Sequence, residues 1–222
     1  MHEEKTDMNF DLTGFAAECH AQDPRGFAEK CAQLRELLEE ANKVTNLTRI
    51  LGEQDFAVKH AADSLSIGKY FPELAEKPLR IADIGCGAGF PSLILAIAYP
   101  QLMITSIDST GKKIAFVADA AKKLGLTNLT AIHGRANELN RKQEFMRRFD
   151  IVTARAVTEA ASICRDTTKF LTPRGRYILY QSPERAESDS AKLQKMRCRI
   201  TEVFELPESA GQRCFLEIVP EK

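Results

Sequence analysis

The sequence lacks several features that point to particular classes of protein. Its charges balance, with 31 Lys and Arg against 31 Asp and Glu in 222 residues. The overall charge therefore favours no polyanionic partner, and a nucleic-acid-binding protein would need a local basic surface instead. Internal repeats and low-complexity segments are absent. The length fits one domain with room for a small appendage, and the 44% of hydrophobic residues suffices for a sizeable core.

Metal-binding, disulfide and membrane patterns are absent as well. The six cysteines are scattered without C-x-x-C spacing, and the four histidines complete no zinc pattern. We therefore expect reduced thiols in a cytoplasmic protein that holds no metal. The first residues lack the apolar core of a signal peptide. The longest apolar run, at 93–99, is too short to span a bilayer.

The most informative segment combines a strand, a glycine loop and a helix. An apolar run at Leu79–Ile84 enters a loop with Gly85, Gly87 and Gly89, and a second apolar run follows at 93–98. This order opens a nucleotide-binding α/β unit. Glycine suits such a loop because it adopts positive φ and lets a ligand approach the backbone closely.

The glycine spacing distinguishes between two nucleotide ligands. Dinucleotide-binding loops follow G-x-G-x-x-G, whereas here Gly89 comes two residues after Gly87 and Phe90 occupies the dinucleotide position. The pattern Asp83-x-Gly85-x-Gly87-x-Gly89 resembles the S-adenosylmethionine loop of class I methyltransferases. A βα turn that is merely rich in glycine is the alternative, so the rest of the chain must decide.

The remaining sequence predicts a helical part followed by alternating strands and helices. Residues from about 10 to 75 show helical periodicity, and Lys77-Pro78 marks a boundary. We divide the chain into a helical N-terminal extension, 1–78, and a methyltransferase-like domain, 79–222. Strands and helices alternate from 79 to 196, which implies a parallel sheet. Two strand-like runs at 199–206 and 213–219, with a turn between them, predict a hairpin.

The predicted fold class is therefore α/β. It is similar to the Rossmann-like class I S-adenosylmethionine-dependent methyltransferase fold, with a seven-stranded, mostly parallel sheet and an antiparallel C-terminal hairpin. A plain dinucleotide-binding fold has no reason to end in such a hairpin. The helix predicted at 56–67 lies in the extension, and helices are also predicted at 92–99, 111–124, 158–170 and 183–196.

Polar residues at strand ends are candidates for cofactor binding. Asp108 ends the second strand, about where a carboxylate accepts hydrogen bonds from ribose hydroxyls. Capping of the helix that begins near Gly111 is the alternative role. Ala136 and Asn137 follow the third strand, where the side chain of Asn137 or backbone groups can hydrogen-bond to an adenine. An ordinary polar loop explains those two residues equally well.

Two further residues are candidates for the reacting centre. Arg155 follows the fourth strand, at the carboxyl edge where open α/β sheets bind ligands. An ion pair with a nearby carboxylate is its alternative role. His60 shares a helix face with Asp63 and Ser64 at i, i+3 and i+4. A structural hydrogen bond is the alternative for this histidine.

Taken together, the motifs resemble the ribosomal RNA small subunit methyltransferase G family, also called glucose-inhibited division protein B. The matching segments appear in the family's order and cover about 42–180. They are Asn46-Leu47-Thr48, Val58-Lys59-His60-Ala61-Ala62-Asp63-Ser64-Leu65, Ile81-Ala82-Asp83-Ile84-Gly85-Cys86-Gly87-Ala88-Gly89-Phe90-Pro91, Asp108-Ser109-Thr110-Gly111-Lys112-Lys113, Gly134-Arg135-Ala136-Asn137-Glu138 and Thr153-Ala154-Arg155-Ala156.

The resemblance implies methyl transfer from S-adenosylmethionine to N7 of a guanine in 16S ribosomal RNA, near the decoding site. The partner would be that RNA or the small ribosomal subunit, bound by a monomer. The resemblance also implies cofactor contacts at Gly85, Phe90, Ala136, Asn137 and Arg155. With the loop spacing, we add Gly87, Gly89 and Asp108 to this set. We take Arg155 and His60 as candidate catalytic residues, and Lys59, Lys112 and Lys113 as candidate RNA contacts.

The absence of other motifs agrees with N7 chemistry. Enzymes that methylate exocyclic amino groups usually carry Asn/Asp-Pro-Pro-aromatic after the fourth strand, and this chain has Thr153-Ala154-Arg155-Ala156. The chain departs from the family at Asn137, where an acidic residue is common, at Ser92, where glycine is frequent, and at Gln181-Ser182, where Lys-Gly is usual. If Gln181 ends the fifth strand, it faces the crevice that admits the substrate. Two alternatives remain: a class I methyltransferase for a small molecule or protein, and a diverged protein that binds without turnover.

Overall fold

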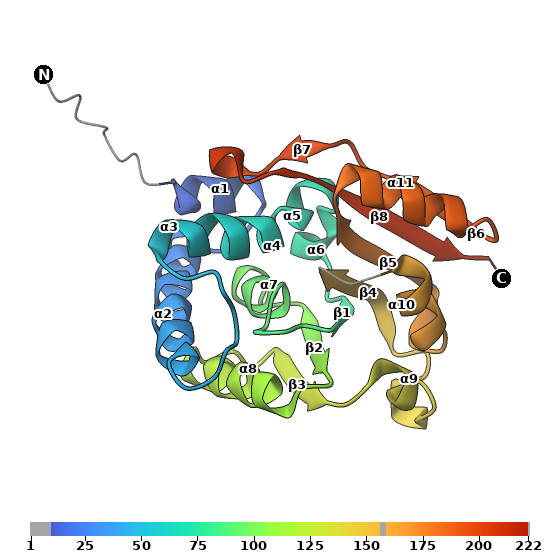
Figure 1. Cartoon of the computed structure of the whole chain (residues 1–222), viewed down its shortest axis with the longest axis horizontal. Coiled ribbons are helices and arrows are strands. Elements are labelled where there is room, and N and C mark those ends of the chain that lie inside the picture. The colour runs from blue at the N-terminus through green and yellow to red at the C-terminus, as the bar shows by residue number, and fades with distance from the viewer. Residues whose placement is uncertain (1–9, 156–158, 222) are drawn as a thin grey trace, which may run out of the picture.

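The computed structural model describes residues 10–155 and 159–221, which form a central sheet with helices on both faces (Figure 1). The strands are β1 (Arg80–Ile84), β2 (Met103–Asp108), β3 (Leu129–His133), β4 (Phe149–Arg155), β5 (Leu171–Gln181), β6 (Met196–Ile200), β7 (Phe204–Glu205) and β8 (Gln212–Pro220).

The strand order is β3-β2-β1-β4-β5-β8-β6, and β7 pairs with β8 off this path. Strands β1 to β5 pair in parallel, whereas β8 runs antiparallel to both β5 and β6. The mostly parallel sheet with an antiparallel C-terminal hairpin is thus confirmed. The sheet has eight strands instead of the seven predicted, because the two residues of β7 add a short pair to β8.

The C-terminal boundaries differ from the prediction. A helix was predicted to run to Met196, but α11 (Pro183–Lys192) ends earlier and β6 begins at Met196. Half-buried Met196, Cys198 and Ile200 alternate there with exposed arginines. This period of two is typical of a strand with one buried face, so the sequence did contain the signal.

Two groups of helices cover the two faces of the sheet. The helical elements are α1 (Leu12–Glu18), α2 (Pro24–Asn42), α3 (Glu53–Asp55), the π-helix η1 (Phe56–Ala62), α4 (Asp63–Leu65), α5 (Ile67–Tyr70), α6 (Glu73–Glu76), α7 (Ser92–Ala98), α8 (Gly111–Lys123), α9 (Ala136–Leu139), α10 (Ala160–Asp166) and α11, with 3-10 turns η2 (Gln143–Phe145) and η3 (Pro207–Ser209). The predicted helix at 158–170 is shorter, as α10, and residue 158 lies outside the described residues.

Successive strand residues point to different hydrophobic clusters. Ile81 and Ile178 join the cluster that contains side chains of α2, α7 and α8, while Ala82 and Leu179 join the cluster with side chains of α10 and α11. Both faces of the central strands are therefore buried, which explains why these strands are continuously apolar in sequence.

The N-terminal helices pack on the sheet through the first of these clusters. Asp11 and Asp23 accept hydrogen bonds from the backbone N–H of Gly14 and Gly26 and so cap α1 and α2. Leu34 of α2 shares its cluster with buried residues of α7. The boundary predicted at residue 78 falls between α6 and β1. The division into an extension and a domain stays a prediction.

The helix predicted at 56–67 is a continuous helical segment of unexpected geometry. Residues Phe56–Ala62 form a π-helix, flanked by single turns of α3 and α4. Such segments occur frequently at functional sites. This one carries Lys59 and His60, two of the candidate residues, and leads into Asp63.

Residues 10–155 and 159–221 lack features of membrane, metal and disulfide proteins. No helix there is long and apolar enough to cross a membrane. No group of three His, Cys, Asp or Glu side chains in these ranges could hold a metal ion. The six cysteines are all free thiols, five of them buried.

Candidate functional site

The candidate residues gather at the carboxyl edge of the parallel strands. The glycine loop follows β1, Asp108 ends β2, and Ala136 begins α9 just after β3. Arg155 ends β4 at the same edge. This is where ligands bind in open α/β sheets, so the topology itself brings together residues that are far apart in sequence.

The three loop glycines all have positive φ, but their surroundings differ. Gly85, Gly87 and Gly89 have φ of 69°, 58° and 91°. A Cβ atom on Gly87 would meet nothing within 4 Å, whereas one on Gly89 would lie 2.4 Å from Cδ1 of Leu93. Gly89 is therefore required for packing α7 against the loop, while Gly85 is exposed and available to a ligand.

Asp108 joins two neighbouring loops. Its Oδ2 accepts a hydrogen bond from the backbone N–H of Gly87 at 3.0 Å, and its Oδ1 accepts one from that of Thr110 at 2.8 Å. Thr110 is the N-cap of α8, which has no side-chain cap hydrogen bond, so Asp108 fixes the residue before the helix but does not cap the helix itself. The carboxylate also lines a cavity, and the two roles are compatible.

A cavity of about 250 Å³ opens between the ends of β1, β2 and β3. Four of the predicted cofactor contacts line it: Gly85, Asp108, Ala136 and Asn137. Gly87, Gly89, Phe90 and Arg155 do not line it. Asn137 is exposed. Half of the predicted cofactor contacts therefore line this cavity, while Phe90 and Arg155 contact each other outside it.

Asp83 lies under the glycine loop and is fully buried. Its Oδ2 accepts hydrogen bonds from the hydroxyl of Ser92 at 2.6 Å and from the backbone N–H of Ser92 at 3.2 Å. The serine that replaces a frequent glycine thus supplies a bond that glycine cannot make. Burial raises the pKa of Asp83 to about 6, although both Ser92 hydrogen bonds oppose this rise.

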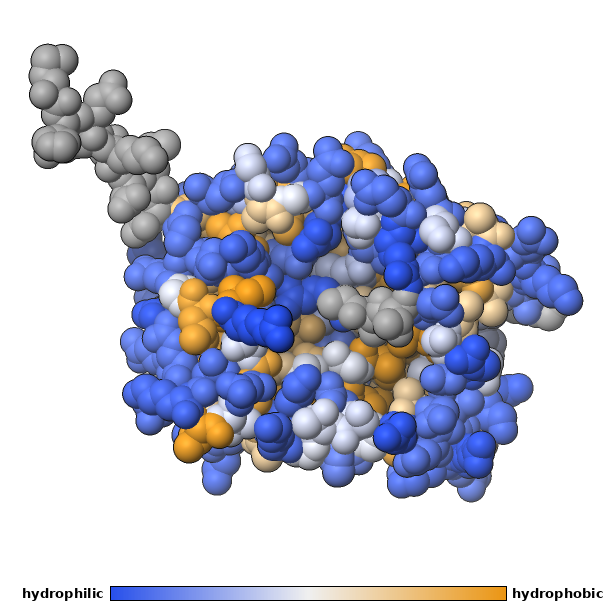
Figure 2. All heavy atoms as spheres, viewed as in Figure 1, coloured by the Kyte–Doolittle hydropathy of each residue, from blue (hydrophilic) through white to orange (hydrophobic). Residues whose placement is uncertain are grey.

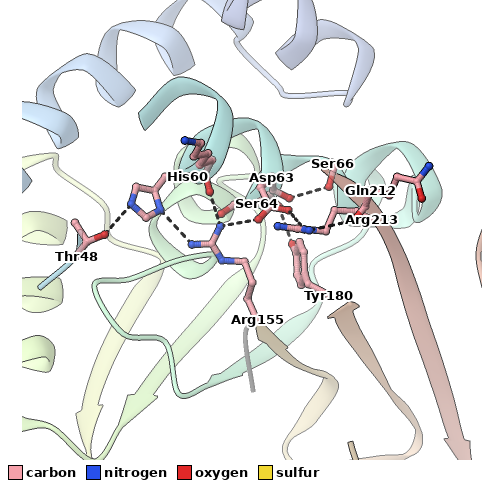
Figure 3. Close-up of polar contacts among 10 residues, drawn as sticks. Thr48, His60, Asp63, Ser64, Ser66, Arg155, Tyr180, Gln212 and Arg213 are labelled. Carbon is pink, nitrogen blue, oxygen red and sulfur yellow. Dashed lines mark hydrogen bonds and ion pairs between the residues drawn. The ribbon is translucent and has the colours of Figure 1, made fainter. Parts of the chain in front are cut away.

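Arg155 connects the end of β4 to η1 (Figure 3). Its Nη1 donates to the carbonyl of Lys59 at 2.9 Å and to Oδ2 of Asp63 at 3.0 Å, and its Nη2 lies 3.2 Å from Nδ1 of His60. The guanidinium carbon also lies 5.5 Å from the ring centroid of Phe90. The predicted ion pair is present, at the same edge as the cavity.

The imidazole of His60 makes contacts through its ring face and through both of its nitrogens. Its ring stacks on Phe90 with centroids 4.0 Å apart. Its Nε2 lies 3.2 Å from the hydroxyl of Thr48 (Figure 3). Because arginine can only donate, Nδ1 must be the acceptor for Arg155, which leaves the proton on Nε2. Burial, reinforced by the charge of Arg155, lowers the pKa of His60 to about 3. The ring is therefore neutral and positions Phe90 and Arg155.

Asp63 receives a second arginine that the sequence analysis missed. Nε of Arg213 donates to Oδ1 of Asp63 at 3.1 Å (Figure 3). The two residues lie 150 positions apart, and no motif links them. Ser64, predicted to share the face of His60, does not join this cluster. Its carbonyl accepts from Tyr180, and its hydroxyl has no partner within the described part of the chain.

A second cavity, of about 550 Å³, lies beside this cluster at the ends of β4 and β5. Its lining comes from η1, α11 and the start of β8 as well as from both strands: Ile50, Lys59, Asp63, Arg155, Tyr180, Gln181, Ser182, Arg185, Ala210 and Arg213. Arg155 therefore faces the larger cavity. The structure offers two adjoining compartments at one edge of the sheet.

The three candidate RNA-binding lysines are not brought together. Lys59 lines the larger cavity and pairs with Asp55 at 2.7 Å. Lys112 and Lys113, in the first turn of α8, line neither cavity. The surrounding surface is mainly hydrophilic, with hydrophobic residues in small separate groups (Figure 2).

Acidification from pH 7 to pH 5 is expected to lower the free energy of unfolding by about 2 kcal/mol through His60. In the unfolded state His60 has a pKa near 6.5 and is protonated at pH 5. In the folded state its pKa is about 3, so it stays neutral at pH 5. Asp83 acts in the opposite direction, because its folded pKa of about 6 exceeds its usual 3.8. Over the same pH interval, Asp83 raises the free energy of unfolding by about 1 kcal/mol.

The variant His60→Gln isolates the histidine's contribution. Urea unfolding at pH 7 and pH 5 should show a loss on acidification in the unchanged protein. The variant should show no loss or a small gain, because Asp83 then acts without opposition. Equal changes in the two proteins would contradict the neutral, buried state of His60.

Comparison with known proteins places the chain among methyltransferases. The family model described as rRNA small subunit methyltransferase G matches residues 28–215. The ribosomal RNA small subunit methyltransferase G of Limosilactobacillus reuteri is 36% identical over 196 residues, covering 86% of this chain and 81% of its own. That of Lactiplantibacillus plantarum is 38% identical over 194 residues, covering 84% and 79%.

Solved structures of lower identity show the same fold. A SAM-dependent methyltransferase from Aquifex aeolicus superposes with a TM-score of 0.52 at 15% identity, covering 68% of this chain and 87% of its own. Fibrillarin from Aeropyrum pernix, crystallised with natively bound S-adenosyl-L-methionine, has a TM-score of 0.51 at 15% identity and covers 64% and 67%. These likenesses establish the class I methyltransferase fold.

Proposed function

Because the chain belongs to the rRNA small subunit methyltransferase G family, we propose that it methylates N7 of a guanine in 16S ribosomal RNA near the decoding site. S-adenosylmethionine is the methyl donor. The observation that carries the proposal is the meeting of three separate sequence motifs, through Gly85, Asp108 and Asn137, on one cavity at the carboxyl edge of the sheet.

The residues of the smaller cavity fit S-adenosylmethionine. Exposed Gly85 has no side chain and a positive φ, so the cofactor can approach its backbone. Asp108 offers carboxylate oxygens to the ribose, and Ala136 and Asn137 offer backbone and amide groups to the adenine. When bound, the cofactor supplies a sulfonium methyl group. Arg155 lines the larger cavity and lies over the ring of Phe90, and both residues are proposed to border the methyl-donating end.

The chemistry of N7 agrees with the absence of a ready general base in this cluster. Guanine N7 carries a lone pair and loses no proton when it gains a methyl group. Both ring nitrogens of His60 are already bonded to Thr48 and Arg155, so the histidine is placed to position rather than to transfer protons. The rate enhancement then rests on proximity and alignment, which can supply about 7–11 kcal/mol in favourable cases. Arg155 is proposed to act by fixing η1 and Phe90.

Asp108→Ala should weaken S-adenosylmethionine binding by about 1–3 kcal/mol, because a polar contact to the ribose is lost. Titration calorimetry measures this directly. Asp108→Asn is the matched control, since it retains one acceptor oxygen and should lose less affinity. An unchanged affinity in the alanine variant would exclude the ribose contact, even if the variant were less stable through loss of the Gly87 and Thr110 hydrogen bonds.

Transfer assays with the purified protein distinguish the remaining alternatives. Labelled methyl groups should appear in small-subunit RNA or particles that lack the modification, and not in protein fractions or small molecules. A class I enzyme for a small molecule or protein would label those instead. A binding-only protein would bind S-adenosylmethionine in calorimetry and transfer nothing to any acceptor.

Further expectations accompany this function. We propose that the protein acts as a monomer in the cytoplasm, that it requires no metal, and that residues 1–78 form a helical extension of a domain at 79–222. Lys59 is proposed to contact RNA at the larger cavity, which it lines. Lys112 and Lys113, at the start of α8, are proposed as a second contact near the cofactor.

A further inference from the structure

The larger cavity contains two arginines that are held in the same unusual way. Arg213, at the start of β8, bonds through Nε to Oδ1 of Asp63 at 3.1 Å, and Arg185, on α11, bonds through Nε to Oδ2 of Asp189 at 3.2 Å. The two carboxylate side chains are only 5% and 1% exposed. Each guanidinium is therefore fixed at its inner nitrogen by a buried acid.

The outer nitrogens of these two arginines remain available. The Arg213 and Arg185 side chains are 32% and 40% exposed. In residues 10–155 and 159–221, neither Nη atom of Arg185 makes a hydrogen bond, and Arg213 uses only Nη1, for the carbonyl of Gln212. Because the rotation of each guanidinium is already restricted, a ligand that binds the outer nitrogens loses little further side-chain entropy.

The two acids that anchor these arginines make further hydrogen bonds, and of the two only Asp63 lines the cavity. Asp63 also receives Arg155, and Asp189 also receives the side chain of Gln181 at 2.8 Å and the backbone N–H of Ala160 at 3.0 Å. Four basic residues and one acidic residue line the cavity. The lining therefore presents positive charge, with its carboxylate turned toward arginine.

Gln181 has a further role besides the one suggested by its place at the end of β5. Its side chain is buried, with the residue 6% exposed, and its amide donates to Asp189. It therefore helps to hold the acid that anchors Arg185. Gln181 also ends β5 and lines the larger cavity, so the expectation that it faces the substrate stays a prediction.

The two anchored arginines and the rest of the cavity lining indicate which class of ligand fits the larger cavity. Fixed guanidinium forks suit phosphate oxygens, which accept two parallel hydrogen bonds. The cavity offers little for stacking a base, because Tyr180 is 5% exposed and its hydroxyl is bonded to the carbonyl of Ser64. The lining thus fits a phosphodiester backbone better than a nucleobase.

We propose that Arg185 and Arg213 bind backbone phosphates of the RNA next to the methylated nucleotide, so that the strand crosses the larger cavity between α11 and η1. This proposal rests on the proposed function and names the path of its substrate. It places the main phosphate contacts on the β5–β8 side of the edge, away from Lys112 and Lys113 on α8.

The test is binding of small-subunit RNA across a salt series, with Arg185→Gln, Arg213→Gln and the double variant. Each single change should weaken binding roughly tenfold at low salt. Each should also reduce the slope of log affinity against log salt by about 0.7–0.9, the release of one counterion. Arg213→Lys should keep the slope, because it keeps the charge. Affinity for S-adenosylmethionine, measured by calorimetry, should stay within about twofold and verifies the fold.

Arg197→Gln is the matched control, since Arg197 is exposed on β6 and lines neither cavity. It should leave both affinity and slope unchanged. If the Arg185 and Arg213 variants behave like this control while the unchanged protein binds RNA, the proposed path is wrong and the proposed function stands. If the unchanged protein binds neither small-subunit RNA nor the small ribosomal subunit, the proposed function and the path are both wrong.

Discussion

Replacing Arg155 by alanine is expected to lower methyl transfer to small-subunit RNA by roughly 100-fold, the size of effect that an ångström of misplacement near a reacting centre can cause. Arg155 holds the carbonyl of Lys59, the carboxylate of Asp63 and the ring of His60 with one guanidinium. Without it, η1 and Phe90 lose their link to the end of β4. The residues proposed to border the methyl-donating end then lose their fixed positions.

The same change should reduce stability by about 3 kcal/mol, because it removes the donors from a buried carboxylate oxygen and a buried ring nitrogen. Arg213 still pairs with the other oxygen of Asp63, which keeps the loss from being larger. Arg155→Lys preserves the charge but loses the forked set of guanidinium donors. Its stability and its transfer rate should lie between those of Arg155→Ala and the unchanged protein. Arg165→Ala, an exposed arginine on α10, is the neutral control. Transfer by Arg155→Ala within threefold of the unchanged protein would contradict the positioning role.

Gly89→Ala is expected to destabilise the protein by about 2–5 kcal/mol, the sum of backbone strain at positive φ and overpacking. Gly89 has φ of 91°, and its added Cβ would lie 2.4 Å and 2.8 Å from Cδ1 and Cγ of Leu93. Leu93 is fully buried and part of the larger hydrophobic cluster, so it cannot move aside cheaply. Thermal and urea unfolding measure the loss.

Gly87→Ala provides an internal comparison within the same loop. Gly87 also has positive φ, at 58°, but its added Cβ would meet nothing within 4 Å. Its cost should therefore be limited to the left-handed backbone penalty of about 1–2 kcal/mol. Equal destabilisation by the two substitutions would mean that the contact with Leu93 does not make Gly89 necessary.

The fold could be predicted because its signals are local and repeated. Continuous apolar runs mark strands that are buried on both faces, as Ile81 and Ala82 show by joining different clusters. The C-terminal end was predicted less well, because the alternation in Met196–Ile200 covers only five residues, so its first residue was assigned to a helix and the strand was predicted to begin at 199. The π-helix at Phe56–Ala62 escaped because helical periodicity does not distinguish α from π winding over two turns.

The site could be predicted only where a motif sits at a strand end. The glycine loop follows β1, Asp108 ends β2 and Asn137 comes after β3, and parallel topology alone brings them to one edge. The partnership of Asp63 with Arg213 depends on how β8 inserts between β5 and β6, which no local pattern specifies. The difference between Gly89, which has no room for a Cβ atom, and Gly87, which has room, likewise depends on the packing of α7.

Mass mapping of 16S ribosomal RNA from cells with and without this gene tests the central claim most directly. The account predicts a 7-methylguanine near the decoding site that is present with the gene and absent without it. It should return when the unchanged gene is supplied, and only weakly with the Arg155→Ala variant. A 7-methylguanine content that is identical in both kinds of cell would contradict the proposed function.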